Sequence, residues 1–319
     1  RPPRSKLFPY TTLFRSKRKI SEKGKYDFFK LLIGNSMVDD DFERMSWDEA
    51  EKMRIEKIKD AVDKYKGKEK ELFSVIEDFL DNIDSSESQI STRYFDIFLQ
   101  QISEADPQIG FSMLKRYNGR LGYHMSFILT GLLKSAEDDA KKSILSYINN
   151  NEYVLEVIYT LELINYCEVE YLEEIAKKNS KESNVLNQII HILFKQYDKS
   201  TYKAKYRDLF AKILVSLNGI KHSNWHNHLF QSDSTLIDSI EEDTVKIMIK
   251  NLVFAQDVSY YVQEILTRLV DKYPLHVINL FKMRIEADDL KSVKKSNRHY
   301  SAIPFRYDYD QFGEKLKKH

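Results

Sequence analysis

Apolar residues recur at helical spacing in one segment after another from Trp47 onward, and this periodicity constrains the fold more than any other feature of the sequence. A stripe with this period predicts an amphipathic α-helix. In the first such segment, residues 47–65, Ser46 followed by Glu49 also predicts a capping box at the helix start. Only 9 glycines and 6 prolines interrupt the 319 residues, too few for the turns of a sandwich or barrel. The sequence therefore predicts an all-α fold.

The second helices of the expected hairpins start at a nearly constant interval. The steps between starts are 30, 31, 33, 42 and 31 residues, and the long step contains the irregular stretch NGIKHSNWHNHLFQSD. The starts are expected near Pro107, Glu137, Glu168, Thr201, Asp243 and Pro274. A period near 31 with short polar loops predicts an α-solenoid of antiparallel helical hairpins, HEAT-like in kind. An irregular helical bundle is the alternative.

The chain divides into four predicted regions. Residues 1–16 resemble the translation of a common short-read sequencing adapter at every position except Lys6, and are treated as a disordered artefact. Residues 17–45 are expected to form an N-terminal connector with a short helix, and residues 46–290 the helical-repeat array. Residues 291–319 are expected to form an extended segment and a short terminal helix. With an artefact at its start, the chain is interpreted as a fragment whose reading frame continues upstream.

The charge balance disfavours nucleic acid as a partner. Fifty basic residues against 49 acidic ones leave a formal charge of +1, so the chain presents no net field to an anionic polymer or an anionic membrane surface. The single cysteine, Cys167, excludes a disulfide within the chain. No apolar run approaches the roughly 18 to 20 residues that a membrane-spanning helix needs. These features predict a soluble cytoplasmic protein without a membrane partner, and they leave the oligomeric state open.

Three histidines in the irregular stretch are the candidate metal ligands. His222 and His226 are spaced i, i+4, which places two imidazoles on one helix face, and His228 is nearby. Two imidazoles at this spacing bind zinc or another divalent metal. The glutamate of an H-E-x-x-H site is replaced by Ser223, so a zincin-type base is absent. The alternative is an exposed polar loop or helix end between repeats.

Other polar residues have structural interpretations that compete with chemical ones. The acidic clusters at 137–139 and 241–243 precede helices, where negative charge stabilises the N-terminal dipole, and a third cluster lies at 39–43. His191 is surrounded by apolar residues and is interpreted as a packed histidine, and the basic run 291–299 as a solvated connector. Several tyrosines fall on apolar stripes and are expected in the core with the hydroxyl reaching solvent: Tyr94, Tyr147, Tyr159 and Tyr171.

The sequence contains no motif of a known catalytic centre. The P-loop, the dinucleotide-binding glycine pattern, the G-x-S-x-G elbow and a paired C-x-x-C are all missing. No catalytic residue and no cofactor are therefore predicted, and the chain is interpreted as non-enzymatic.

Three segments resemble the helical region that follows the nucleotidase module of large bacterial STAND-type NTPases, several of which are linked to antiphage defence. They are Met45–Tyr65, Leu186–Asp198 and Tyr300–Leu316, and the resemblance extends over about residues 40–319. It implies a helical-repeat region of a multidomain protein whose nucleotide-binding residues lie upstream, and it carries no site residue onto this chain.

The leading hypothesis is a helical-repeat sensor or scaffold that binds a protein partner along its concave face. A metal-dependent enzyme that uses His222, His226 and His228 is the second hypothesis. A nucleic-acid-binding solenoid is the third, ranked lower because the charges balance.

Overall fold

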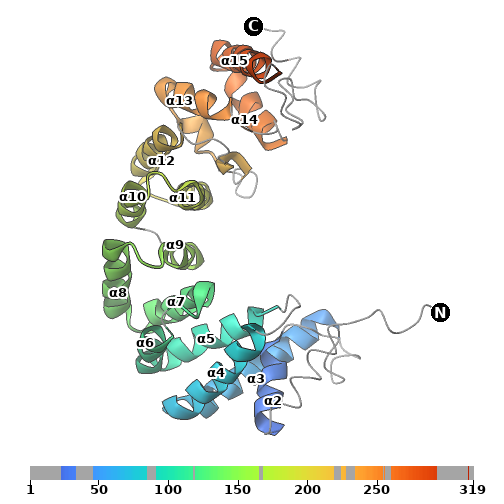
Figure 1. Cartoon of the computed structure of the whole chain (residues 1–319), viewed down its shortest axis with the longest axis vertical. Coiled ribbons are helices and arrows are strands. Elements are labelled where there is room, and N and C mark those ends of the chain that lie inside the picture. Colours follow the sequence, from blue (N-terminus) through green and yellow to red (C-terminus); the bar gives the residue numbers. More distant parts are fainter. Residues whose placement is uncertain are drawn as a thin grey trace, which may run out of the picture. The chain divides into compact units, whose positions relative to one another are not determined.

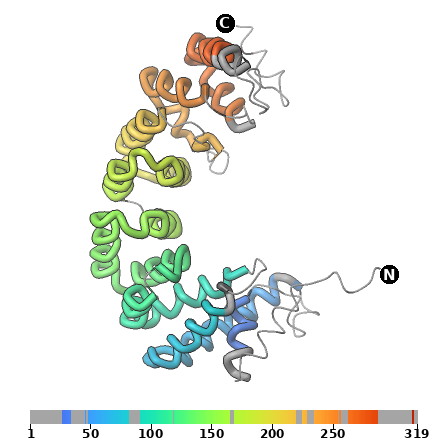
Figure 2. Tube along the Cα trace, in the orientation of Figure 1, coloured from blue at the N-terminus to red at the C-terminus, as the bar shows by residue number. Residues whose placement is uncertain are grey.

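The computed structural model describes residues 23–33, 46–84, 91–117, 119–164, 168–218, 224–227, 234–253, 255, 260–292 and 315 (Figure 1). Within these residues every regular element is a helix, so the fold class is all-α, as predicted (Figures 1 and 2). The structure comprises two compact units, residues 1–146 and 147–319. The boundary falls inside helix α8 (Glu137–Asn150) and inside the predicted array. The adapter-like residues 1–16 and most of 291–319 lie outside the described residues.

Unit 1 is built around α5, which packs against α2, α3, α6 and α7. The helices of this unit before α8 are α2 (Lys23–Leu32), α3 (Trp47–Tyr65), α4 (Glu69–Asp84), α5 (Arg93–Ala105), α6 (Pro107–Arg116), the 3-10 turn η3 (Gly122–His124) and α7 (Met125–Ser135). The predicted capping box of α3 is confirmed, because Ser46 Oγ accepts from the backbone N–H of Glu49 and the Glu49 carboxylate accepts from that of Ser46.

Aromatic rings fill the core of unit 1. Phe28 of α2 lies edge-on to Phe98 of α5, with ring centroids 5.0 Å apart, and to Tyr65 of α3, at 5.3 Å. Phe79 and Phe95 extend the cluster, with centroids 4.4 Å apart. Each of these side chains is at most 6% exposed. The cluster joins α2, α3, α4 and α5 through burial of large apolar area and edge-to-face ring contacts.

A glycine allows two helices of unit 1 to pack closely. A Cβ on Gly131 of α7 would lie 2.2 Å from the backbone oxygen of Gln100 on α5, far inside the contact distance. Only a residue without a side chain lets the two backbones approach this closely. Gly131 therefore fixes the packing of α7 on α5.

Unit 2 is built around α11, which packs against α9, α10 and α12. After the end of α8, its elements are α9 (Val154–Leu163), α10 (Val169–Lys178), α11 (Ser183–Tyr197), α12 (Lys203–Leu217), the 3-10 turn η5 (Ile237–Ser239), α13 (Glu242–Leu252), α14 (Tyr260–Val270) and α15 (Pro274–Ser292). Five consecutive or nearly consecutive apolar side chains of α11 are at most 1% exposed: Ile189, Ile190, Ile192, Leu193 and Phe194. A helix buried on so many sides belongs to the centre of a unit.

The predicted starts of the second helices agree with the structure within two residues: α6, α8, α10, α12, α13 and α15 begin at Pro107, Glu137, Val169, Lys203, Glu242 and Pro274. In unit 2, α10 contacts α12, α12 contacts α13, and α13 contacts α15. This is the order of neighbours in a row of stacked helices. The solenoid over the whole chain stays a prediction, because it extends across both units.

The helices of this row in unit 2 satisfy one another's C-terminal carbonyls. Lys178 of α10 donates to the carbonyls of Ile148 and Asn149 at the end of α8, both at 3.0 Å. Asn251 of α13 donates to the carbonyl of Leu214 in the last turn of α12, also at 3.0 Å. The last carbonyls of a helix have no partner within it, so side chains from the next helix fill this need.

Arg284 of α15 is the strongest example. Its guanidinium Nη1 donates to the carbonyls of Leu252, Val253 and Ala255 at the end of α13, over 3.0, 3.1 and 2.9 Å. The residue is fully buried. A cation at this end also stabilises the helix dipole of α13. Nothing in the periodicity of the sequence marks a charged residue for the core.

We predict that Arg284→Met lowers the free energy of unfolding of unit 2 by about 3 kcal/mol, because buried carbonyls lose their donor. The measurement is urea denaturation in a Trp47→Phe background, so that Trp225 alone reports on unit 2. Lys282→Met, on an exposed position of the same helix, is the matched control and should change it by no more than about 0.5 kcal/mol. Equal effects of the two substitutions would contradict the capping role.

Candidate interaction surface

Helix α9 carries apolar side chains on two opposite faces. One face is buried in unit 2 through Val157, Ile158 and Leu161, none more than 2% exposed. On the other, Leu155, Tyr159 and Leu163 are 40%, 41% and 42% exposed. These three residues are spaced by four and form a single ridge along the helix. We refer to Leu155, Tyr159 and Leu163 as the α9 stripe.

A charged cluster borders the α9 stripe on the side of α11. Glu162 accepts hydrogen bonds at Oε2 from Gln188 (3.2 Å) and at Oε1 from Lys195 (3.0 Å). The His191 Nε2 atom lies 3.3 Å from the same Oε1. All three partners belong to one face of α11. The hydrogen bond with His191, and then the one with Lys195, lowers the pKa of Glu162 to about 2, although burial acts in the opposite direction.

This cluster makes the border of the stripe rigid and charged. The Glu162 side chain is 17% exposed, so water competes weakly for its oxygens. A carboxylate held by three donors has little freedom to rotate away. The Lys195 side chain remains 37% exposed and presents a cation next to the apolar ridge. Helices α9 and α11 therefore display an ordered surface in which apolar and charged groups have fixed places.

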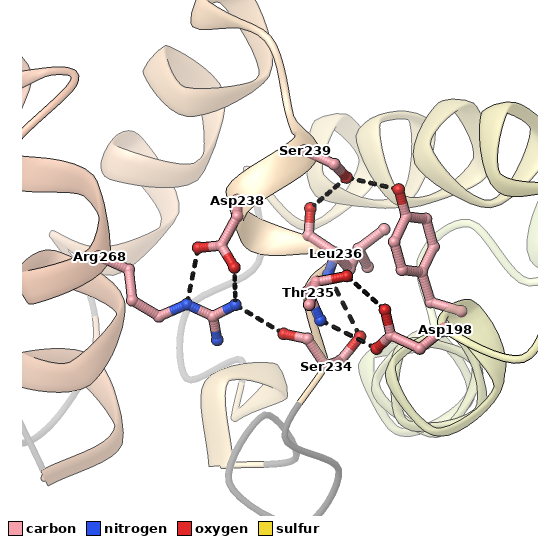
Figure 3. Close-up of polar contacts among 8 residues, drawn as sticks. Asp198, Ser234, Thr235, Leu236, Asp238, Ser239 and Arg268 are labelled. Carbon is pink, nitrogen blue, oxygen red and sulfur yellow. Dashed lines mark hydrogen bonds and ion pairs between the residues drawn. The ribbon is translucent and has the colours of Figure 1, made fainter.

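A second polar network fastens the segment before α13, as Figure 3 shows. The Asp198 carboxylate, just after α11, accepts from the Thr235 backbone N–H at 3.0 Å and from its hydroxyl. Burial alone raises the pKa of Asp198, but the bonds from Thr235 and Ser234 outweigh it and leave the pKa below its ordinary value. The network thus favours an ionised carboxylate that holds this segment against the end of α11.

Arg268 of α14 holds the same segment from the other side (Figure 3). Its Nε donates to Asp238 Oδ1 at 2.8 Å, and Nη2 donates to Asp238 Oδ2 and, at 2.7 Å, to the carbonyl of Ser234. The Tyr197 hydroxyl donates to Ser239 Oγ at 2.7 Å. Paired bonds between guanidinium and carboxylate fix orientation as well as distance. The arrangement is that of a structural clamp, with α11 and α14 on either side of η5.

The predicted metal ligands are only partly within the described residues. His226 is described. It lies in a short 3-10 turn at residues 225–227 and is 5% exposed, and the residue before this turn, Asn224, has no regular structure. Its ring lies edge-on to that of Trp225, with centroids 6.0 Å apart. His222 and His228 lie outside the described residues. Among the residues that the structure describes, no group of three or more metal-ligating side chains is found. The metal site stays a prediction.

Other predictions have mixed outcomes. The acidic residues Glu137–Asp139 and Glu242 with Asp243 occupy the first turns of α8 and α13, as their helix-start interpretation requires. Tyr94 is buried as expected, but Tyr159 is not, because its stripe faces away from the packed side of α9. The cluster at 39–43, Cys167 and the side chains of the run 291–299 lie outside the described residues.

Sequence reasoning missed a buried acid–base pair in unit 1. His124 Nδ1 lies 2.5 Å from Asp96 Oδ1, and both side chains are less than a tenth exposed. Burial raises the pKa of Asp96, while the hydrogen bond with His124 acts the other way. The edge of the His124 ring meets Phe95, with centroids 5.1 Å apart. The two residues are 28 positions apart in the chain, so no local pattern joins them. The pair connects α5 to the start of α7.

Comparisons with known protein families, with curated proteins and with solved structures find no match to this chain. The resemblance to the helical region of STAND-type NTPases therefore stays a prediction from the three quoted segments. Among the helices of the described residues, none combines the length and the apolar character needed to cross a membrane.

We predict that Glu162→Gln destabilises unit 2 most above about pH 5. The pKa of Glu162 is lowered in the folded state, so its contribution is present above the ordinary value of 4.5 and is lost as the pH falls toward about 2. The measurement is urea denaturation followed by Trp225 fluorescence in the Trp47→Phe background. The difference in free energy of unfolding between the proteins with and without Glu162→Gln should shrink over this window. Glu173→Gln, which removes an exposed partner of Lys212, should show little effect at any pH.

Proposed function

We propose that this chain is a helical module that binds a protein partner, and that the α9 stripe is part of its binding surface. The observation that carries the proposal is the ridge of Leu155, Tyr159 and Leu163 on a helix whose other face is fully packed. Contiguous exposed apolar side chains on a soluble protein mark interaction sites. Tyrosine at the centre of such a ridge combines large contact area with a polar end, as the dominant residues of interfaces do.

The charged border supports a specific rather than a general apolar contact. Lys195 and Glu162 lie beside the ridge and are held by the cluster described above. A partner that covers the stripe meets these fixed charges, so it must match their pattern. Ordered side chains also lose little conformational entropy when the partner binds. The geometry thus favours recognition of one protein surface over non-specific adhesion.

We further propose that the module acts as a sensor or scaffold within a larger bacterial multidomain NTPase of the cytoplasm. The support is the resemblance of the three quoted segments and the regular helix starts, which favour a HEAT-like array with a concave partner surface. Catalysis is assigned to an upstream domain. Recovery of the upstream reading frame from the source DNA tests this part: a Walker motif would support it, and a natural start codon close to Lys17 would overturn it.

The two alternative functions gain no specific support. Nucleic-acid binding needs cations that converge on one groove, whereas several cations of unit 2 pair with carboxylates of a neighbouring element, such as Lys212 with Glu173 and Arg268 with Asp238. The metal-dependent enzyme rests on His222, His226 and His228, of which the structure describes His226 alone. Metal analysis of the purified protein, with no bound zinc, manganese or nickel, would end that hypothesis.

The binding surface is tested by photo-crosslinking. A photoreactive phenylalanine analogue at position 159 should capture a defined protein from native lysate, whereas the same analogue at position 202 should not. Tyr202 is the matched control because it is 63% exposed and lies at the N-cap of α12, away from α9. Capture of the same set of proteins at both positions would count against the α9 stripe.

We predict that Tyr159→Ser weakens binding of the captured partner by roughly 10-fold or more, as expected for a central interface tyrosine. Tyr202→Ser should change it by less than about 2-fold. Both substitutions are on exposed positions, so circular dichroism should show unchanged helix content and thermal midpoint. Equal binding by wild type and Tyr159→Ser, measured by titration with the purified partner, would reject the surface.

A further inference from the structure

Helix α15 also has two apolar faces, and one of them faces solvent. Val277 and Leu280 are fully buried on the side of Arg284, which contacts the end of α13. On the other side, Leu275, Ile278 and Ile285 are 77%, 46% and 41% exposed. Large aliphatic side chains at such exposure are unfavourable in water unless something covers them.

The exposed residues of α15 follow a heptad pattern. Leu275, Ile278, Lys282 and Ile285 are separated by three, four and three positions, which is the spacing of alternating a and d positions. Helices with this seam pack side by side on a second helix, knobs into holes. We refer to these four residues as the α15 seam. Its spacing indicates a helix as the occupant, rather than an extended peptide or a small molecule.

Lys282 determines which helix fits. It occupies an a position in the middle of the seam, its side chain is 72% exposed, and the Glu286 carboxylate lies 4.0 Å from its ammonium. In a parallel pair, a positions face each other, so a second copy would place Lys282 against Lys282. In an antiparallel pair, a faces d, and the ammonium would meet an isoleucine. Both arrangements are unfavourable. The first brings two cations together, and the second removes the ammonium from water against an aliphatic side chain, with only the exposed Glu286 carboxylate at 4.0 Å to offset the charge.

We propose that the α15 seam is a docking site for an amphipathic helix of a partner protein that carries an acidic residue opposite Lys282. Leucine-like residues of the partner fill the holes beside Leu275, Ile278 and Ile285, and its carboxylate pairs with the Lys282 ammonium. A single charged a position sets register and excludes self-pairing at some cost in affinity. The seam continues the row in which α12, α13 and α15 pack in sequence, so the partner helix takes the place of the next helix.

This inference does not rest on the α9 stripe. The two surfaces belong to different helices, and loss of binding at one leaves the other intact. Substitutions at Tyr159 and at Lys282 therefore distinguish failure of the proposed function from failure of this docking site.

The test uses two synthetic helical peptides as probes. Both carry leucine at a and d positions except at one central a position, which is glutamate in the first peptide and lysine in the second. Fluorescence anisotropy with the full chain should show the glutamate peptide binding roughly 10-fold more tightly than the lysine peptide, a difference of about 1.4 kcal/mol. Lys282→Glu should reverse this order, and such a gain of binding cannot come from misfolding.

Two further variants and one hydrodynamic measurement complete the test. Ile278→Ser should weaken binding of the glutamate peptide by roughly 10-fold or more, whereas Tyr202→Ser, at the N-cap of α12, should leave that binding unchanged. The absence of saturable binding by either peptide would overturn the proposal, and it is also the result expected if residues 293–314 of the chain itself cover the seam. A reversible dimer in sedimentation that Ile278→Ser abolishes would assign the seam to a second copy and overturn the proposal equally.

Discussion

The structure of unit 2 depends on how the C-terminal ends of its stacked helices are satisfied. Helices that lie side by side in the same direction bring their negative ends together, and each end leaves carbonyls without a partner inside the helix. Lys178, Asn251 and Arg284 meet this need from the following helix of the row. In these three pairs the donor comes from the following helix of the row, so the C-terminal ends of α8, α12 and α13 are complete only when that helix has folded on them. The stability of these helix ends therefore depends on the tertiary contact with the following helix of the row.

Ion pairs between helices also have a direction along the chain. In several pairs the carboxylate belongs to the earlier element and the cation to the later one, as in Glu77 with Arg116 and Glu170 with Lys205. Each exposed pair contributes little by itself. A shared direction nevertheless disfavours a helix that packs with its faces reversed, since acid would then meet acid. The balanced net charge of the chain is consistent with this arrangement, in which charges serve internal contacts.

Helices α9 and α15 each carry an exposed apolar face in addition to a buried one. Both are packed on one side and present large apolar residues on the other, and both have a charged residue at or beside the exposed ridge. Helix α3 is one-sided by comparison, because polar residues dominate its exposed face. These two surfaces are the basis of the two binding proposals.

The sequence by itself determined the all-α class, the helix starts and the capping box of Ser46 and Glu49, because periodicity and caps are local properties of the chain. It could not place Tyr159 in solvent, since a helix with apolar residues all round does not reveal which face will be covered. Nor could it find the Asp96–His124 pair, the Glu162 cluster or the buried Arg284, whose partners are 26 or more residues away along the chain. Those contacts were decided by tertiary structure alone, because only packing brings distant helices within hydrogen-bond distance and removes the water that would otherwise compete.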